Sequence, residues 1–287
     1  MQIILPTIIL SCVYALLGAG FIITYKSSRI INFAFAEIAL FFCYIVVFLT
    51  FFLGGKTTIP IMIVLALGFF FGLMIYRFLI RPMIGESVLS TIILTVALGI
   101  IINAVSALIW KGEVQTIKFA WRNLYNFPGG INISSTEIIT IIATIVLFAA
   151  LGCFYRFSKI GRQMRAAAEN ILLSSQRRIN IYLITGVAWG ISVFIIGGAG
   201  ILFGANYGVS IYMANVALKG LSVALVGGLD SLRGAVPAAV IIALSEKLTA
   251  YYINPRLSEA IPFIIMLIVL IVRPWGLFGT EEEIERV

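Results

Sequence analysis

The sequence has 287 residues, of which 61% are hydrophobic and 11% are charged, whereas a soluble domain carries about 25% charged residues. This composition excludes a soluble fold. The net charge of +8 comes from Lys and Arg in short links between apolar runs, which excludes a basic face for nucleic acid. The absence of histidine excludes histidine-based catalysis, and neither a metal nor a cofactor is expected.

Continuous apolar runs predict an all-α, polytopic helix bundle with eight or nine membrane spans, because lipid leaves backbone groups no partner outside the chain. In chain order the runs cover about residues 3–24, 30–53, 59–80, 87–110, 135–156, 181–205, 211–229, 234–252 and 260–273. The seventh is the weakest, with Asn215 and Lys219 in its middle, and a broken or re-entrant helix is the alternative. We expect one transmembrane domain over residues 1–280 and a short charged tail over 281–287.

The link 156–180 carries the largest cluster of basic residues and is therefore predicted to be cytoplasmic. Its basic residues are Arg156, Lys159, Arg162, Arg165, Arg177 and Arg178. Counting spans back from it places the N-terminus outside. The C-terminal tail is cytoplasmic if the seventh run crosses the membrane, and external if that run is re-entrant.

Polar residues interrupt two of the predicted spans. Asn32 and Glu37 lie near the start of the second one, where an unpaired carboxylate costs several kcal/mol unless it faces water or a partner. Glu37 is therefore expected in the bundle interior, either as a pore or gate residue or in an ion pair with Lys26 or Arg29. Lys219 is either a pathway residue or an interfacial lysine whose amine reaches the membrane surface.

Residues 161–170 of the basic link are rich in strong helix formers and predict a short amphipathic helix. Met164 and Ala168 share its apolar face with Ile171 and Leu172. Such a helix could dock into a groove of a cytoplasmic partner. The alternative is a basic loop that only sets the topology.

Glycines and a proline interrupt an apolar stretch at residues 227–237. Broken helices of this kind lie beside substrate paths in transporters, and a plain polar turn is the alternative. The chain contains no GxxxxGK[ST] phosphate loop and no Ser-His-Asp set, so we expect neither ATP hydrolysis nor enzymatic activity. A membrane-embedded enzyme fails for want of a polar catalytic cluster.

Five motifs, in order along residues 5–279, resemble the LivH-type permease subunit of branched-chain amino-acid ABC importers. They are Tyr14-Ala15-Leu16-Leu17-Gly18-Ala19-Gly20 with Ile31-Asn32-Phe33-Ala34 and Glu37; Thr95 to Gly99; Gly161-Arg162 with Arg165-Ala166 and Glu169-Asn170; Gly227-Gly228 with Ser231, Gly234 and Ala235; and Arg273-Pro274-Trp275-Gly276-Leu277-Phe278-Gly279.

The resemblance implies a type II ABC importer fold in the cell membrane, surrounded by lipid and without nucleic acid. Its partners would be a second permease (LivM type, or a second copy), two cytoplasmic ABC ATPases and an extracytoplasmic substrate-binding protein. The implied translocation path comprises Asn32, Phe33, Phe35, Glu37, Thr95, Gly99, Gly227 and Gly228. The implied ATPase-coupling residues are Gly161, Arg162, Met164, Arg165, Ala168, Glu169 and Asn170.

The sequence departs from the family pattern at two places, and two other functions stay open. Phe35-Ala36 stand where the family often has His-Gly, which leaves the substrate open, and the segment 173–180 lacks the usual small residues and glycine, which leaves the ATPase partner open. The alternatives are a gradient-driven carrier or channel and an ABC permease for urea or amides. A carrier would need ionisable sites deep in the spans, for which Glu37 is the clear candidate.

Overall fold

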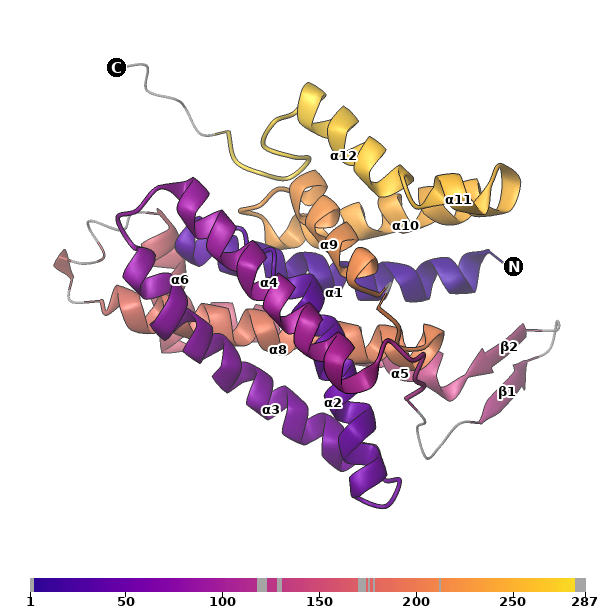
Figure 1. The fold of residues 1–287 in the computed structure, drawn as a ribbon. Helices are drawn as coiled ribbons and strands as arrows, with labels where there is room; N and C mark the ends of the chain where they lie inside the picture. The colour runs from indigo at the N-terminus through magenta and orange to yellow at the C-terminus, as the bar shows by residue number, and fades with distance from the viewer. Residues whose placement is uncertain are drawn as a thin grey trace.

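The computed structural model describes residues 3–117, 123–127, 131–169, 174, 176, 177, 179–211 and 213–281. Over these residues the chain is a bundle of helices (Figure 1). The longer helices are α1 (Ile4–Ser28), α2 (Phe35–Phe52), α3 (Thr58–Ile75), α4 (Val88–Trp110), α5 (Ser135–Phe157), α6 (Lys159–Glu169), α8 (Ile181–Tyr207), α9 (Met213–Gly227), α10 (Ala235–Tyr252) and α12 (Ile261–Val272). Short helical turns are η1 (Tyr76–Ile80), η2 (Arg81–Met83), η3 (Leu232–Gly234) and α11 (Pro255–Ser258).

Seven helical segments of the described residues are long and apolar enough to cross a membrane. They are α1, α2, α3 with its two following turns, α4, α5, α8 and η3 with α10. The prediction of a multi-pass, all-α membrane bundle is thereby confirmed. Two of the nine predicted runs, now α9 and α12, are not among these seven. They have 15 and 12 residues, fewer than the roughly 20 that a crossing requires.

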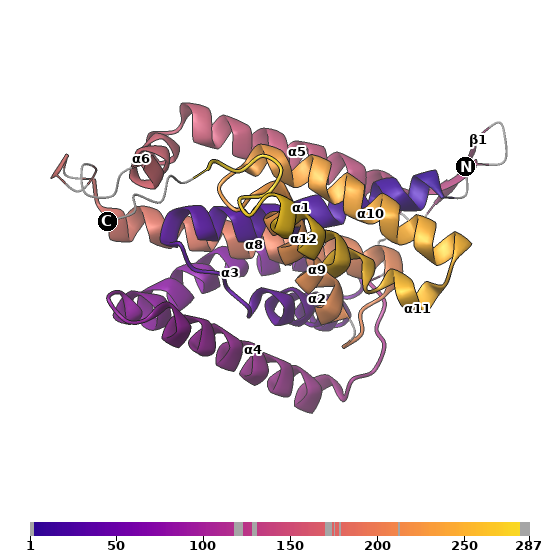
Figure 2. The same cartoon turned by 90° about the horizontal axis from the view of Figure 1, so that it is seen from above.

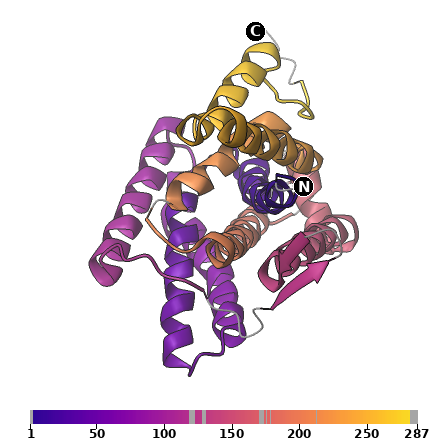
Figure 3. The same cartoon turned by 90° about the vertical axis from the view of Figure 1, so that its right-hand side faces the viewer.

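Helices α1 and α8 form the centre of the bundle, and the others surround them (Figure 3). Buried residues make up 89% of the most apolar stretch of α1 and 78% of that of α8, but only 22% for α4 and 17% for α5. Small residues permit the central packing: a Cβ at Gly72 of α3 would lie 2.5 Å from the Trp189 carbonyl oxygen of α8. The outer faces of α4 and α5 stay apolar and exposed, which suits contact with lipid or a partner helix.

The second predicted span begins inside the bundle, not at its end. α1 ends at Ser28, residues 30–32 are not helical, and α2 starts only at Phe35. The Phe35 ring packs edge-on against Phe21 with centroids 5.1 Å apart, and Phe21 lies seven residues before the end of α1, about 10 Å into the bundle. Irregular backbone at this depth is tolerated only where protein or a cavity surrounds it.

The link between the fourth and fifth predicted spans contains a feature that the sequence did not indicate, a two-stranded antiparallel hairpin of β1 (Leu124–Phe127) and β2 (Ile131–Ser134). It lies at the same end of the bundle as the N-terminus, and α6 lies at the other end (Figure 2).

The last described residues are held near α6. The Thr280 amide donates to Asp230, which lines a cavity together with residues of α5 and α6. The last described residues therefore lie at the α6 end, the end of the basic link, whereas the sequence left the side of the C-terminal tail open. Of the predicted tail, only Glu281 belongs to the described residues.

Candidate functional site

An open groove of about 390 Å³ lies where the start of α2 meets the middle of α4 and one residue of α9. It is lined by Phe33, Glu37, Val96, Gly99, Ile100, Asn103, Ala104 and Leu218. Three of these residues, Phe33, Glu37 and Gly99, belong to the predicted translocation path. The structure thus brings two distant parts of the chain, near residues 35 and 100, to one surface.

Polar contacts hold the irregular start of α2 against α4. The Phe33 amide donates to the Thr95 hydroxyl at 3.3 Å, and the Ala34 amide donates to Asn32 Oδ1 at 3.0 Å. These bonds satisfy backbone groups that a continuous helix would have satisfied internally. Asn32 is fully buried, and its Nδ2 has no hydrogen-bond partner within the described part of the chain. Asn32 and Thr95 therefore support the groove from behind.

Glu37 has a neutral partner on the neighbouring helix. Asn103 Nδ2 donates to Glu37 Oε2 at 2.8 Å, and both side chains are half-buried at the groove wall. Lys26, one of the two predicted ion-pair partners, lines a different cavity beside α5 and α6. Glu37 therefore contacts α4 and lines the open groove, and its role as a pore or gate residue stays a prediction. Asn103 was not predicted, although an asparagine inside an apolar span was a visible signal.

Gly99 lets α4 approach α2 beside this pair. A Cβ at Gly99 would lie 3.4 Å from Ala34 Cα and 3.5 Å from Glu37 Cγ, which is ordinary van der Waals contact. Any longer side chain would enter the groove. A carboxylate and an amide set into an apolar wall can bind a cationic or hydrogen-bonding group, while the apolar residues contact a hydrocarbon side chain.

Phe35 does not line the groove. Its side chain is fully buried between Phe21 and Trp189, with centroids 5.1 Å and 6.3 Å away. The residue that departs from the family pattern therefore contributes to the core at the start of α2. Its influence on a solute in the groove would be indirect.

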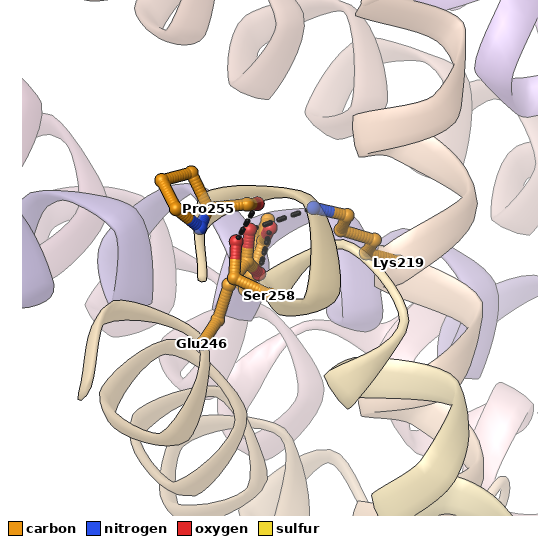
Figure 4. Close-up of polar contacts among 5 residues, drawn as sticks. Lys219, Glu246, Pro255 and Ser258 are labelled. Carbon is orange, nitrogen blue, oxygen red and sulfur yellow. Dashed lines mark hydrogen bonds and ion pairs between the residues drawn. The ribbon is translucent and has the colours of Figure 1, made fainter. Parts of the chain in front are cut away.

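A second polar cluster lies buried between α1, α9 and α10. Lys219 Nζ lies 2.6 Å from Glu246 Oε1, and the Tyr14 hydroxyl donates to Glu246 Oε2 at 2.7 Å. Figure 4 shows Lys219 and Glu246 pointing toward one another. Lys219 is 6% exposed, so the interpretation that its amine reaches the membrane surface is wrong. Glu246 was overlooked as an ionisable group inside a predicted span.

The family is decided by a comparison with known proteins. The family model described as "Branched-chain amino acid transport system / permease component" matches residues 3–270. The chain belongs to this family. It is accordingly a multi-pass protein of the cell membrane, as the resemblance of its motifs implied.

Relatives of this permease match over nearly their whole length. The branched-chain amino acid permease LivH of Escherichia coli (strain K12) is 26% identical over 294 residues, covering 97% of this chain and 94% of that protein. BraD of Pseudomonas aeruginosa is 25% identical over 288 residues, covering 96% and 94%. Among solved structures, PsaBC from Streptococcus pneumoniae aligns with 96% of this chain and 93% of its own at 14% identity and a TM-score of 0.49, a likeness too distant to carry an argument.

The predicted coupling segment of the permease is helical, but its apolar face is turned inward. Gly161 and Met164 are buried, the latter at 7% exposure, because α6 lies against α1, α5 and α8. The expectation that Met164 faces a partner is therefore wrong, and Ala168 is half-buried. Among the members of the predicted set whose exposure the structure describes, Arg162 and Arg165 are exposed. Glu169 ends α6, and Asn170 lies outside the described residues.

Gly227 and Gly228 of the permease lie away from the groove and meet the C-terminal motif. The Leu277 amide donates to the Val226 carbonyl at 2.8 Å and the Phe278 amide to the Gly227 carbonyl at 3.2 Å. Gly228 has φ +102°, and its Cβ would lie 2.5 Å from the Gly279 nitrogen, so both the conformation and the close approach require glycine. Two motifs that were separate in the sequence form one contact.

Proposed function

We propose that this chain is the pore-forming permease subunit of an ABC importer that takes up branched-chain or other amino acids, with ATP hydrolysed by separate subunits. The family supports a transport role, and the sequence contains no phosphate loop with which to hydrolyse ATP itself. The observation that carries the proposal is the Glu37–Asn103 pair in the wall of an open, otherwise apolar groove.

The groove is one wall of the proposed translocation path. The ammonium group of an amino acid binds Glu37 and Asn103, and its apolar side chain contacts Val96, Ile100 and Leu218. A second permease, of LivM type or a second copy, closes the open side. Asn32, Thr95 and Phe35 position the start of α2, and Gly227 and Gly228 hold the C-terminal segment.

Coupling to two cytoplasmic ABC ATPases occurs on the exposed basic face of α6. Arg162 and Arg165 are exposed there, while the apolar residues of α6 anchor it to the bundle, so a movement of α6 passes to α1, α5 and α8. An acidic or carbonyl-lined groove on the ATPase fits this face. An extracytoplasmic binding protein docks at the opposite end, where the β1–β2 hairpin lies.

Reconstitution in liposomes tests the proposal. The chain with its second permease, two ATPases and the binding protein is expected to take up radiolabelled leucine only with ATP, and the chain alone is expected to take up none. Competition by valine, urea and acetamide separates the amino-acid importer from an importer of urea or amides. Uptake by the chain alone, driven by an imposed proton or sodium gradient, would establish a carrier and overturn the proposal; Glu246 is then the first residue to test.

A further inference from the structure

A second cavity, with a volume of about 700 Å³, lies at the α6 end of the bundle. Its walls come from α1, α5, α6, the segment after α9, and the start of α10. The lining residues are Ile22, Ile23, Lys26, Phe148, Gly152, Tyr155, Arg156, Arg165, Asp230, Ser231, Leu232, Arg233 and Val236. We call this cavity the basic pocket.

Four basic residues from four different elements converge on the basic pocket. Lys26 comes from α1, Arg156 from α5, Arg165 from α6 and Arg233 from η3. Within the described part of the chain, none of the four forms an ion pair with a carboxylate. The lining carboxylate, Asp230, accepts hydrogen bonds from the Thr280 amide and hydroxyl. The pocket therefore holds an excess of positive charge that the described side chains leave uncompensated.

The polarity of the basic pocket changes along the bundle axis. Phe148 lies eight residues before Arg156 on α5, about 12 Å deeper in the bundle. On α1, Ile22 and Ile23 lie one turn deeper than Lys26, and Val236 of α10 adds apolar surface. The pocket thus has a cationic mouth at the end of the bundle and an apolar floor deeper inside. This order matches a phospholipid, whose anionic headgroup would lie at the mouth and whose hydrocarbon chains would lie on the floor.

We propose that the basic pocket binds the phosphate headgroup of an anionic phospholipid from the leaflet at the α6 end. Arg156 and Arg233 pair with the phosphate oxygens as guanidinium groups do, and the first carbons of the acyl chains lie against Phe148, Ile22 and Val236. Basic residues whose only role is to set the membrane topology need to lie in the links, but nothing requires them to converge on one cavity. A free phosphate would use the cationic mouth but gain nothing from the apolar floor.

Native mass spectrometry of the full-length chain in detergent tests this binding. The probes are phosphatidylglycerol, phosphatidylcholine with identical acyl chains, and inorganic phosphate. We expect one phosphatidylglycerol to bind at least fivefold more tightly than phosphatidylcholine, and millimolar phosphate not to displace it. Arg156→Gln with Arg233→Gln should weaken phosphatidylglycerol binding by roughly tenfold or more.

The matched control is Arg77→Gln with Arg177→Gln, which removes two exposed charges at the same end outside the pocket and should leave the binding unchanged. Equal binding of the two lipids, displacement by phosphate, or the same loss in the control variant would overturn the proposal. In the complex with its ATPases, a pocket variant that keeps phosphatidylglycerol but loses the ATPase would also overturn it, because the pocket would then be a protein-docking surface.

Discussion

Glu37 and Glu246 are two carboxylates inside apolar helices, and the structure treats them in opposite ways. Glu246 accepts a hydrogen bond from Tyr14 and forms an ion pair with Lys219, and its side chain is only 12% exposed. Glu37 has the neutral Asn103 as its partner and lines an open groove. Among the described residues Glu37 forms no ion pair.

The difference separates a structural charge from an available one. A carboxylate in lipid is costly unless a partner neutralises it or water reaches it. Lys219 neutralises Glu246 inside the bundle, so this pair joins α9 to α10 and has no charge left for a solute. The Glu37 carboxylate is stabilised only by the hydrogen bond from Asn103 and by access to the open groove. Its charge therefore stays available to attract a cationic group. The following variants test this contrast, in order of expected effect.

Glu246→Ala should destabilise the fold most, because it leaves the Lys219 ammonium buried without a counter-charge. Removing one partner of a buried ion pair costs about 3–5 kcal/mol. We expect a clear fall in the melting temperature of the purified chain, measured by fluorescence-detected size exclusion. Adding Lys219→Met removes the orphaned charge and should recover most of the loss. A single variant as stable as the parent would show that the pair does not hold α9 to α10.

Glu37→Gln should reduce transport and spare stability. Glutamine keeps the shape and the hydrogen bond to Asn103 but loses the charge that would bind an ammonium group. A hydrogen bond to a charged group contributes about 1.5–3 kcal/mol, so ATP-dependent uptake by the reconstituted importer should fall roughly tenfold or more. The control is Glu86→Gln, an exposed carboxylate outside the groove, which should transport normally. Unchanged uptake by Glu37→Gln would remove Glu37 from the path.

Gly99→Leu should obstruct the groove, whereas Gly99→Ala should be tolerated. The added Cβ meets its neighbours at 3.4–3.5 Å, but the leucine branch must occupy the groove or force α4 away from α2. If α4 is forced away, overpacking costs about 1–3 kcal/mol of stability and the melting temperature should fall. If the leucine instead fills the groove, uptake should fall with little change in melting temperature. Uptake and melting temperature are measured together. Equal uptake by both variants would show that the solute passes elsewhere.

Tyr14→Phe should have the smallest effect. It removes one hydrogen bond to Glu246 and leaves the ion pair with Lys219 intact, at a cost of about 1 kcal/mol. The melting temperature should fall by a few degrees, and ATP-dependent uptake should stay at the parental level. A fall in uptake larger than that of Glu37→Gln would reverse the assignment of the two carboxylates.

Most of the helices could be predicted because hydropathy and backbone hydrogen bonding are local. The run 87–110 became α4 (Val88–Trp110) and the run 135–156 became α5 (Ser135–Phe157). The start of α2 could not be predicted, because the residues before it are as apolar as those of a membrane-spanning helix. They are Ile30, Ile31, Phe33 and Ala34. Their irregular backbone depends on contacts such as the Phe33 amide with Thr95, which is 62 positions away.

Partners of the charged groups were harder to predict than the groups themselves. Asn103 and Glu246 both lie within predicted spans and could have been singled out as intramembrane polar residues. Their partners could not, since Asn103 is 66 positions from Glu37 and Tyr14 is 232 positions from Glu246. The apolar pattern of residues 161–170 likewise predicted an amphipathic helix without indicating that Met164 packs against its own bundle.

The sequence by itself determined that the chain is an all-α, multi-pass membrane protein that resembles a branched-chain amino-acid permease, with a carboxylate inside the second helix. Each of these properties follows from composition, from the order of motifs, or from the requirement that lipid places on every backbone segment. Only the tertiary structure decided that Glu37 lines a groove while Glu246 is neutralised, and that Gly228 contacts Gly279. The physical reason is that the free energy of a buried charge depends on which distant side chains surround it, and no local pattern records that.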